Sequence, residues 1–378
     1  MRQAQSKCRI HLVAGTRPNI VKVAPLFTCL KAHDWCVPMF VWFTQHFTAE
    51  LSADNLEDLG VNAADHIIDV NQAGFGTRLG SMIAGYTECL EAERPDAVVV
   101  AGDVDTTLGA ALAAKRLGIP VVHLEAGLRS YDISMPEEVN RTLIDAISDI
   151  WLAPSEAASQ NLILHEGRAP EKVHFVGNIM IDSLKTTLSA SIQGEMLARF
   201  GLARNSFGLA TFHRPANVDS PEKLAWLLDV LEDASERHPV VFPLHPRTQS
   251  MLERHAMMDR LKAMPGLRLA GPIRYKNFVN LLAASLFVLT DSGGLQEEAA
   301  YLRKFCFTLR DNTERPVTLH CGSNQLVNHE TIKSVMKAVL SAPGDTGHIR
   351  RIPLWDGLTA ERCALILKNW WSVRMASG

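Results

Sequence analysis

Carboxylates stand at three places in the amino-terminal half of the sequence. Asp103 follows the apolar residues 97–101, Glu125 follows residues 121–124 in HLEAGLRS, and Glu137 lies in MPEEVNR. A carboxylate beside buried, apolar chain has to be paired or functional, because its charge is costly to bury alone. Carboxylates are also among the groups that general acid–base chemistry uses.

Each of these carboxylates also has a structural explanation. Asp103 can cap the helix that is predicted after it. Glu125 can form an ion pair with Arg129, and Glu137 can stabilise the positive end of a helix that starts near Pro136. The residue types leave both explanations open.

Three segments have the composition of anion-binding loops. Residues 15–22 (GTRPNIVK) combine a glycine turn with Arg17 and Lys22 at a predicted helix start. In residues 289–299 (LTDSGGLQEEA), paired glycines end a strand and open a helix, whose N–H groups favour phosphate. The glutamates one turn further on suit the hydroxyl groups of a ribose. His213, in TFHRPANVD, is either a phosphate or acid–base group or a surface histidine.

The elements that must position these residues alternate between strands and helices. Apolar runs predict strands at residues 10–14, 39–43, 97–101 and 121–124, and the pattern restarts after Val176 with residues 207–211, 240–244 and 286–290. This alternation predicts an α/β protein with two Rossmann-like, doubly wound domains. Ligands bind at the carboxyl ends of parallel strands, so two facing domains would enclose a central cleft.

We predict a boundary between the domains close to residue 185. The N-terminal domain comprises residues 1–185, with a C-terminal helix of about residues 358–378 packing back on it, and the second domain comprises residues 186–357. A chain of 378 residues suits two domains of ordinary size.

Composition excludes several classes of protein. The net charge of −3 offers no general attraction for nucleic acid or acidic membranes, and no apolar run approaches membrane-spanning length. The seven cysteines are scattered without a CxxC pair, which favours a reducing compartment over disulfides or structural zinc. With no signal peptide at the start, we expect a cytoplasmic protein. No cluster has metal-ligand spacing along the sequence, so no metal is expected.

Taken together and in this order, the segments resemble the non-hydrolysing UDP-N-acetylglucosamine 2-epimerases. The resemblance extends over most of the chain, from about residue 15 to residue 327, and rests on GTRPNIVKVAPL, TQH, GDVDTT, HLEAGLRS, MPEEVNR, VGNIMIDSL, the HR at His213, the LHP that includes His245, DSGGLQEEA and RDNTERP. It implies the two-domain GT-B fold with UDP bound by the second domain. It also implies a homodimer, a UDP-sugar substrate and no cofactor.

The resemblance further implies a reaction in two steps. The C2 proton is removed and UDP leaves C1 to give a 2-acetamidoglucal, and UDP then adds back after protonation of C2 on the other face. The motifs place Asp103, Glu125, Glu137 and His213 in the catalytic set, without deciding which carboxylate is the base. They assign UDP-sugar binding to Arg17, Lys22, Arg141, His245, Phe278, Ser292, Gly293, Gly294, Glu298 and Arg315. Phe278 also fits a core position of a helix.

Departures from the family motifs leave the sugar and a family activator site open. Asn19 replaces a glutamate, and Thr44 replaces a glycine. Asp105 adds a negative charge, and Val317 follows ERP at a position where glutamate is frequent. Hydrolysing epimerases usually depart from the first motif, residues 15–22, so its presence here favours the non-hydrolysing enzymes. A 2-epimerase for a diacetamido uronic acid stays possible. A GT-B glycosyltransferase would need an acceptor site. A non-catalytic binding protein would tolerate loss of the carboxylates.

Overall fold

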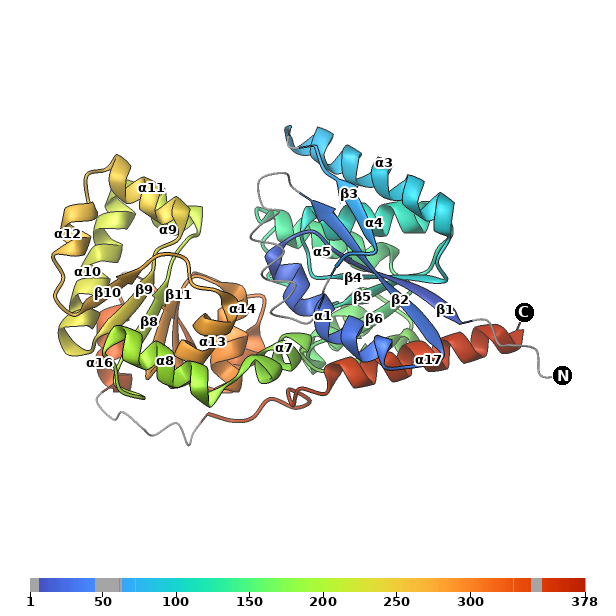
Figure 1. The fold of residues 1–378 in the computed structure, drawn as a ribbon. Helices are drawn as coiled ribbons and strands as arrows, with labels where there is room; N and C mark the ends of the chain where they lie inside the picture. The colour runs from blue at the N-terminus through green and yellow to red at the C-terminus, as the bar shows by residue number, and fades with distance from the viewer. Residues whose placement is uncertain are drawn as a thin grey trace. The chain divides into compact units, whose positions relative to one another are not determined.

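The computed structural model describes residues 7–44, 61, 63–71, 73–328, 330–340 and 349–377, apart from the side chains of residues 17, 18, 339, 340 and 377. The chain divides into two compact units (Figure 1). Unit 1 comprises Met1–Lys185 with Pro353–Gly378, and unit 2 comprises Thr186–Ile352.

Unit 1 is built on a parallel sheet. Within the described residues its strands run in the order β3-β2-β1-β4-β5-β6-β7. They are β1 (Cys8–Ala14), β2 (Cys36–Thr44), β3 (His66–Asp69), β4 (Ala97–Ala101), β5 (Val121–Leu124), β6 (Ile150–Ala153) and β7 (Val173–Phe175). The order reverses between β1 and β4, and ligands of doubly wound sheets bind beyond the carboxyl ends of strands at such a point.

Helices cover both faces of this sheet. They are α1 (Arg17–Lys31), α3 (Phe75–Glu93), α4 (Asp105–Arg116), α5 (Pro136–Ile147), α6 (Glu156–Gln160), the π-helix η1 (Asn161–His165), the 3₁₀ turn η2 (Pro170–Lys172), α7 (Ile179–Thr187) and α17 (Thr359–Ser377). In β1, Ile10 and Leu12 face the core cluster under α1 and α17, whereas Val13 faces the cluster under α3 and α4. This alternation is that of a strand buried on both faces.

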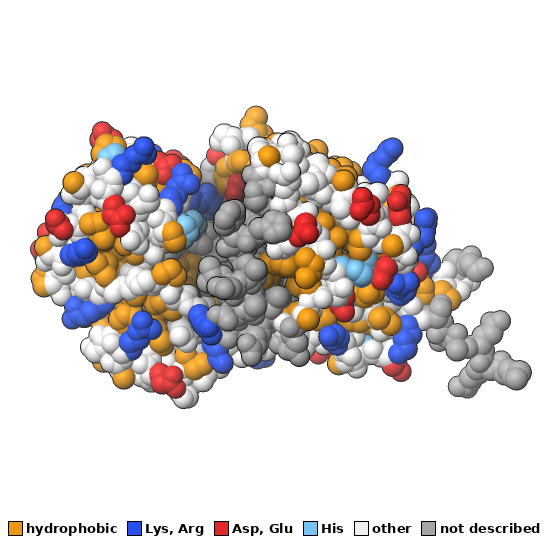
Figure 2. Space-filling view, turned by 45° about the horizontal axis from the view of Figure 1, so that its top comes forward, with side chains coloured by type: hydrophobic (Ala, Val, Ile, Leu, Met, Phe, Trp, Pro, Cys, Tyr) orange, Lys and Arg blue, Asp and Glu red, His pale blue; other side chains and the backbone are white. Residues whose placement is uncertain are grey.

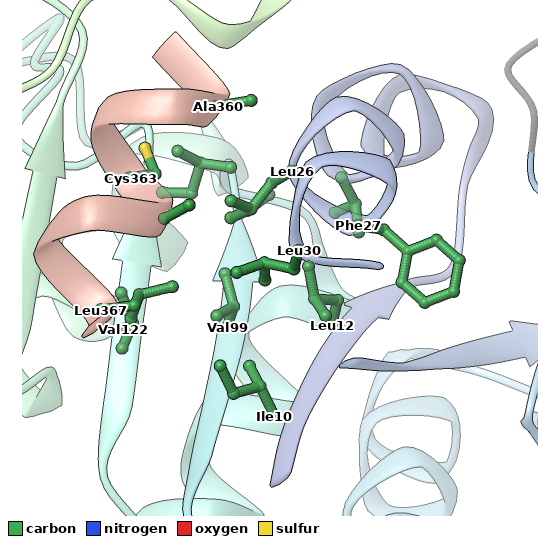
Figure 3. Close-up of a cluster of buried hydrophobic side chains, with 14 of the residues drawn as sticks. Ile10, Leu12, Leu26, Phe27, Leu30, Val99, Val122, Ala360, Cys363 and Leu367 are labelled. Carbon is green, nitrogen blue, oxygen red and sulfur yellow. The ribbon is translucent and has the colours of Figure 1, made fainter. Parts of the chain in front are cut away.

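The C-terminal helix α17 completes the core of unit 1. Cys363 and Leu367 of α17 pack with Leu26 and Leu30 of α1 over the strands (Figure 3). All four side chains are fully buried. Helix α17 therefore removes a continuous apolar area from water and stabilises the sheet through the hydrophobic effect.

A buried histidine lies on the opposite face of β1. His11 is fully buried, and its Nδ1 lies 3.2 Å from the hydroxyl of Tyr86 on α3. Burial, together with the neighbouring His66, lowers the pKa of His11 to about 4. The folded protein therefore keeps this imidazole neutral at neutral pH.

The low pKa of His11 predicts a loss of stability in acid. The unfolded chain binds a proton here near pH 6.5, but the folded chain binds it only near pH 4. This contribution to the free energy of unfolding is therefore complete above pH 6.5 and is lost as the pH falls toward 4, by roughly 2–3 kcal/mol at pH 4.5. Urea unfolding of wild type and His11→Gln at pH 7 and 4.5 measures it. Identical pH dependence in the two proteins would contradict this assignment.

Unit 2 repeats the architecture. Within the described residues its parallel sheet has the order β10-β9-β8-β11-β12-β13. Its strands are β8 (Gly208–Thr211), β9 (Val240–Pro243), β10 (Leu267–Ala270), β11 (Phe287–Thr290), β12 (Phe305–Leu309) and β13 (Asn324–Val327). Its helices are α8 (Ala190–Phe200), α9 (Pro215–Val218), α10 (Pro221–Arg237), α11 (Pro246–Arg254), α12 (Met258–Lys262), α13 (Tyr275–Ala284), α14 (Gly293–Tyr301), α15 (Pro316–His320) and α16 (Ile332–Leu340). Here the order reverses between β8 and β11.

The surface has a mixed charge. On the face drawn in Figure 2, basic and acidic side chains are interspersed over both units, in keeping with the small net charge of −3. None of the helices in the described ranges is both long and apolar enough to cross a membrane.

Candidate active site

Glu125 and Lys22 form an ion pair at the switch point of unit 1. Lys22 lies on α1 and Glu125 follows β5, and the two side chains are 10% and 3% exposed. Gly102, which follows β4, has a φ of 69°, and a Cβ there would lie 2.8 Å from Lys22 Nζ. A glycine is therefore needed at 102 for the ion pair to pack against the end of β4.

Glu125 itself has a φ of 70°, which is rare for a residue with a side chain. Such a conformation costs of order 1–3 kcal/mol and persists only where the surroundings impose it. The ion pair with Lys22 and the close approach of Gly102 are such surroundings. Strain of this kind concentrates at functional sites.

Arg129 does not pair with Glu125. The ion pair between these two residues that the sequence suggested is therefore wrong, and Glu125 pairs with Lys22 instead. Arg129 donates instead to Asp145, at 2.7 Å, and to Glu166. The sequence spacing of four residues suggested the first pair, but Arg129 lies in the loop after β5 and turns toward α5.

A buried network centred on Asp145 supports the same loops. Asp145 Oδ1 lies 2.6 Å from His123 Nδ1, and His123 Nε2 donates to the carbonyl of Gly102 at 2.9 Å. Burial raises the pKa of Asp145, but His123 and Arg129 outweigh burial and hold that pKa below its ordinary value. His123 thus ties the backbone at Gly102 to α5 and positions the loop that carries Asp103. Asp145 was not predicted from the sequence, because nothing nearby in the chain marks it as part of a buried polar network.

Asp103 is held by Arg141, a residue predicted from the sequence to bind the UDP-sugar. Arg141 donates to Asp103 Oδ2 at 2.5 Å and, with its other terminal nitrogen, to Glu138 at 2.8 Å. Asn140 donates to the backbone carbonyl of Asp103 at 2.9 Å. Asp103 is 21% exposed at the side chain, whereas Arg141 is 4% exposed. The buried arginine therefore fixes the orientation of a carboxylate that still reaches solvent.

A cavity opens beside this carboxylate within unit 1. Its volume is 280 Å³, and it is lined by Thr16, Arg78, Met82, Asp103, Val104, Asp105, Thr106, Pro136, Glu137 and Asn140. Two of the carboxylates predicted to be catalytic, Asp103 and Glu137, thus line one space. A volume of this size is just below the range of about 300–1,000 Å³ that is usual for small-molecule sites.

Adjacent glutamates at the start of α5 have different environments. Glu137 is exposed at the cavity. Glu138 is 3% exposed and accepts hydrogen bonds from the backbone of Ser130 and Tyr131, from the hydroxyl of Ser130 and from Arg141. Only Glu137 is available to a ligand, and Glu138 serves to hold the loop after β5.

This contrast predicts opposite effects for two matched variants. Glu137→Gln removes a carboxylate that is predicted to transfer protons at the cavity, so kcat should fall by about 100-fold with the melting temperature unchanged. Glu138→Gln places an amide donor against existing donors and should destabilise the protein by about 1–3 kcal/mol. Steady-state kinetics and calorimetry on both variants separate the two roles. Equal loss of activity with no change in stability would contradict the distinction.

In unit 2, Asp291 follows β11 and forms hydrogen bonds to the loop after β8. This carboxylate is fully buried and accepts the backbone N–H groups of His213 and Arg214, the latter at 2.9 Å, and the side-chain amide of Asn217 at 3.2 Å. The His213 Nδ1 lies 3.3 Å away and its side chain is 40% exposed. Asp291 therefore orients His213 toward solvent at the switch point of the second sheet. This aspartate lies in the LTDSGG motif, but the motif alone did not predict a role for it.

A second histidine stands next to His213. The rings of His213 and His245 are 5.2 Å apart, and His245 Nδ1 accepts the backbone N–H of Arg247 at 3.1 Å. That bond leaves the proton of the neutral ring on Nε2. Burial, followed by the nearby His213, lowers the pKa of His245. His245 is thus a neutral donor, and it is the more exposed of the two residues, since His213 is partly buried.

Helix α14 starts at the end of β11 with the predicted glycines. Ser292 is its N-cap residue and makes no side-chain cap hydrogen bond. A Cβ on Gly293 would lie 2.6 Å from Arg315 Nη1, so glycine permits the arginine to cross the helix start. Arg315 also pairs with Glu297 at 3.0 Å and with Glu314. The N-terminus of α14 offers backbone N–H groups and positive potential to a phosphate, and these two carboxylates hold the guanidinium beside it.

Glu314 keeps this arginine in place. Burial raises the pKa of Glu314, but Arg315 and Arg310 together outweigh it and hold the pKa far below its usual range. Glu298, one turn into α14, is 4% exposed and accepts the hydroxyl of Tyr275 at 2.9 Å. Its predicted contact with a ribose would share that carboxylate with Tyr275.

The remaining predicted residues are less informative. The Phe278 ring packs against the apolar core of unit 2, which fits the core explanation raised from the sequence. Gly294 lies in the first turn of α14. Arg17 starts α1, and its side chain lies outside the described residues. Asn19, a departure from the family motif, donates to the carbonyl of Ala101 at 2.8 Å and so links α1 to the end of β4.

Two Rossmann-like parallel sheets in one chain, each with polar loops at its switch point, define a protein of the GT-B fold. A family profile described as UDP-N-acetylglucosamine 2-epimerase matches residues 29–368. The chain therefore belongs to the UDP-N-acetylglucosamine 2-epimerase family, which is a family of isomerases. The fold and family predicted from the sequence are confirmed.

Individual relatives agree with this membership. The chain is 36% identical to the UDP-N-acetylglucosamine 2-epimerase of Methanococcus maripaludis over 85% of this chain and 88% of that protein. It is also 36% identical to the UDP-2,3-diacetamido-2,3-dideoxy-D-glucuronate 2-epimerase of Pseudomonas aeruginosa, over 84% and 88%. The Methanocaldococcus jannaschii UDP-GlcNAc 2-epimerase, solved with UDP-GlcNAc and UDP, superimposes with a TM-score of 0.85 at 33% identity, covering 96% and 99%.

Proposed function

We propose that this protein interconverts UDP-N-acetylglucosamine and UDP-N-acetylmannosamine by inverting carbon 2. Membership of the epimerase family and the names of the relatives from Methanococcus and Methanocaldococcus support this substrate. The observation that carries the proposal is the placement of Asp103 and Glu137 on one cavity beside the switch point of unit 1. Inversion at a carbon next to the anomeric centre needs a base and an acid, and two carboxylates supply both.

The proposed mechanism removes the C2 proton and expels UDP from C1, which forms 2-acetamidoglucal. Protonation of C2 from the other face and return of UDP complete the inversion. Asp103, Glu125 and Glu137 are the proposed proton-transfer groups of unit 1. Lys22 is already paired with Glu125, so its position favours orienting that carboxylate over binding phosphate directly.

The residues of unit 2 supply the proposed site for UDP. Ser292, Gly293 and Gly294 offer the start of α14 to the diphosphate, with Arg315 beside them. His213, oriented by Asp291, is a proton donor of the right type for a leaving diphosphate oxygen. Glu298 is proposed to accept the hydroxyl groups of the ribose.

A second substrate has equal support from identity. The Pseudomonas relative, named for a diacetamido uronic acid, is as similar to this chain as the Methanococcus relative is. Purified protein is therefore incubated in parallel with UDP-N-acetylglucosamine and with UDP-2,3-diacetamido-2,3-dideoxy-D-glucuronate, and products are separated by anion exchange. We expect UDP-N-acetylmannosamine from the first and no turnover of the second. Turnover of the uronic acid alone would reassign the substrate, and free UDP with N-acetylmannosamine would indicate hydrolysis.

Two copies of the chain are proposed to assemble. Four large apolar side chains on α5 and in the loop before it are 45–85% exposed, namely Tyr131, Ile133, Val139 and Leu143. Covering such a group against a second copy would remove it from water. Light scattering should give the mass of a dimer for wild type and of a monomer for Leu143→Glu. A monomeric wild type would refute the assembly.

The free thiols further support a cytoplasmic location.

A further inference from the structure

Three potential metal ligands meet in unit 1 away from the carboxylates of the cavity. His11 comes from β1, His66 from the edge strand β3, and Glu93 is the last residue of α3. Nitrogen or oxygen atoms of the three all lie within 4.8 Å of one another. His11 is fully buried, and the side chains of His66 and Glu93 are 20% and 29% exposed. The group is thus closed on the side of the sheet and open toward the surface.

The two imidazoles turn the same atom toward the carboxylate. His66 Nε2 lies 3.3 Å and His11 Nε2 lies 3.9 Å from Glu93 Oε2. Both nitrogen atoms are buried, and neither makes a hydrogen bond within the described part of the chain. A buried polar atom without a hydrogen bond is uncommon and requires an explanation, and a bound metal ion is one such explanation.

An ion-pair cluster is the competing explanation. It would need a hydrogen-bonded imidazole, but the fully buried His11 Nε2 lies 3.9 Å from Glu93 Oε2, which is too far for a hydrogen bond. The charge of Glu93 is already matched by Arg9, whose guanidinium donates to Oε2 at 2.8 Å. A neutral imidazole with an unused nitrogen is what a metal ion requires as a ligand.

The position of Tyr86 suits a metal ligand as well. The hydroxyl of Tyr86 lies 3.2 Å from His11 Nδ1 and accepts its proton when the ring is in that tautomer. The lone pair is then on Nε2, which faces His66 and Glu93. Histidine ligands of metals are usually oriented by such a bond on the other ring nitrogen.

We propose that His11, His66 and Glu93 form a binding site for a divalent zinc-type metal ion. Two imidazoles and one carboxylate are a ligand set that Zn²⁺ takes, with a water molecule in the fourth position, whereas Mg²⁺ and Ca²⁺ prefer oxygen alone. Bonds of about 2.0–2.2 Å require these atoms to draw together by about 1 Å. His66 opens the short edge strand β3, so it can make that movement with little disturbance of the core.

The ion would act on structure and not on the chemical step. It would join β1, β3 and the C-terminal end of α3, which are far apart in the sequence. Arg78, near the other end of α3, lines the cavity with Asp103. Arg78 and Glu93 are 15 residues apart on this helix, which corresponds to about 22 Å. Zinc should therefore raise the melting temperature without changing kcat at 25 °C.

The test uses tag-free, full-length protein stripped of metal with chelator and titrated with zinc chloride by calorimetry. Cys29, His33 and Glu361 form another group of potential ligands among the described residues, so the titrations are made in the Cys29→Ser background. His66→Gln removes a ligand at one edge of the sheet. His174→Gln is the matched control, because His174 is a half-buried histidine on β7 at the other edge.

We expect one zinc ion per chain, a higher melting temperature with zinc, and no binding of magnesium. Binding should weaken on the order of 100-fold in His66→Gln, since loss of a ligand costs at least as much as loss of a group that orients one, and should be unchanged in His174→Gln. Cobalt in place of zinc should give the intense visible absorption of a tetrahedral site in the control and lose it in His66→Gln. Failure to bind zinc, or equal affinity in both variants, would overturn the proposal.

Discussion

Asp103→Asn is expected to lower kcat by about 1,000- to 10,000-fold, the upper end of what general acid–base groups contribute. Asparagine fills the same volume and can still accept the hydrogen bond from Arg141, which now lies 2.5 Å from the carboxylate. The geometry around α5 should therefore survive, while the side chain can no longer take up a proton. We expect the melting temperature and the affinity for UDP to stay close to those of wild type.

Asp105→Asn is the matched control for this variant. Asp105 lines the same cavity, but it pairs with Arg78 at 2.8 Å and lies outside the proposed proton-transfer set. Its replacement should change kcat by less than about tenfold, because a partly exposed pair contributes little. Steady-state kinetics with calorimetric UDP binding compares the two. An Asp103→Asn enzyme that turns over at the rate of Asp105→Asn would remove Asp103 from the chemistry.

Lys22→Met should have the largest effect on stability. Lys22 and Glu125 are almost fully buried at the side chain, so removing the lysine leaves a buried carboxylate without its cation. Breaking a buried pair in this way costs about 3–5 kcal/mol. The free energy of unfolding, measured in urea, should fall by that amount, and activity should be lost with it.

The double variant Lys22→Met/Glu125→Gln separates folding from chemistry. With both charges gone, no unpaired charge is buried, and most of the lost stability should return. Activity should stay absent, because the double variant lacks a proposed proton-transfer carboxylate. If the double variant regained activity, Glu125 would be a structural residue; if it stayed as unstable as Lys22→Met, burial of the pair would not explain the loss.

Periodicity was sufficient for the main elements of the fold. The apolar runs at residues 10–14, 97–101 and 121–124 lie within β1, β4 and β5, and the restart after Val176 corresponds to the second sheet. The short edge strand β3 (His66–Asp69) was not predicted, because its alternation of exposed and buried residues is only four residues long. β6 and β7 were also missed, since β6 follows α5 with almost no turn signal and β7 has three residues.

The carboxylates of the site could be predicted, but their partners could not. Motif position singled out Glu125, whereas its partner Lys22 lies on α1 and reaches it only because β1, β4 and β5 are neighbours in the sheet. Sequence spacing favoured Arg129, which the fold directs to Asp145. The group of His11, His66 and Glu93 could not be predicted either. These residues are far apart in the sequence, and only the order of strands in the sheet brings them together.

The most direct test of the proposed reaction is the fate of the C2 hydrogen. Purified protein is incubated with UDP-N-acetylglucosamine in deuterium oxide and followed by NMR. Deprotonation at C2 predicts UDP-N-acetylmannosamine carrying deuterium at C2, with deuterium also entering the remaining substrate as the reaction reverses. Formation of UDP-N-acetylmannosamine that keeps its original C2 proton would contradict proton transfer by these carboxylates.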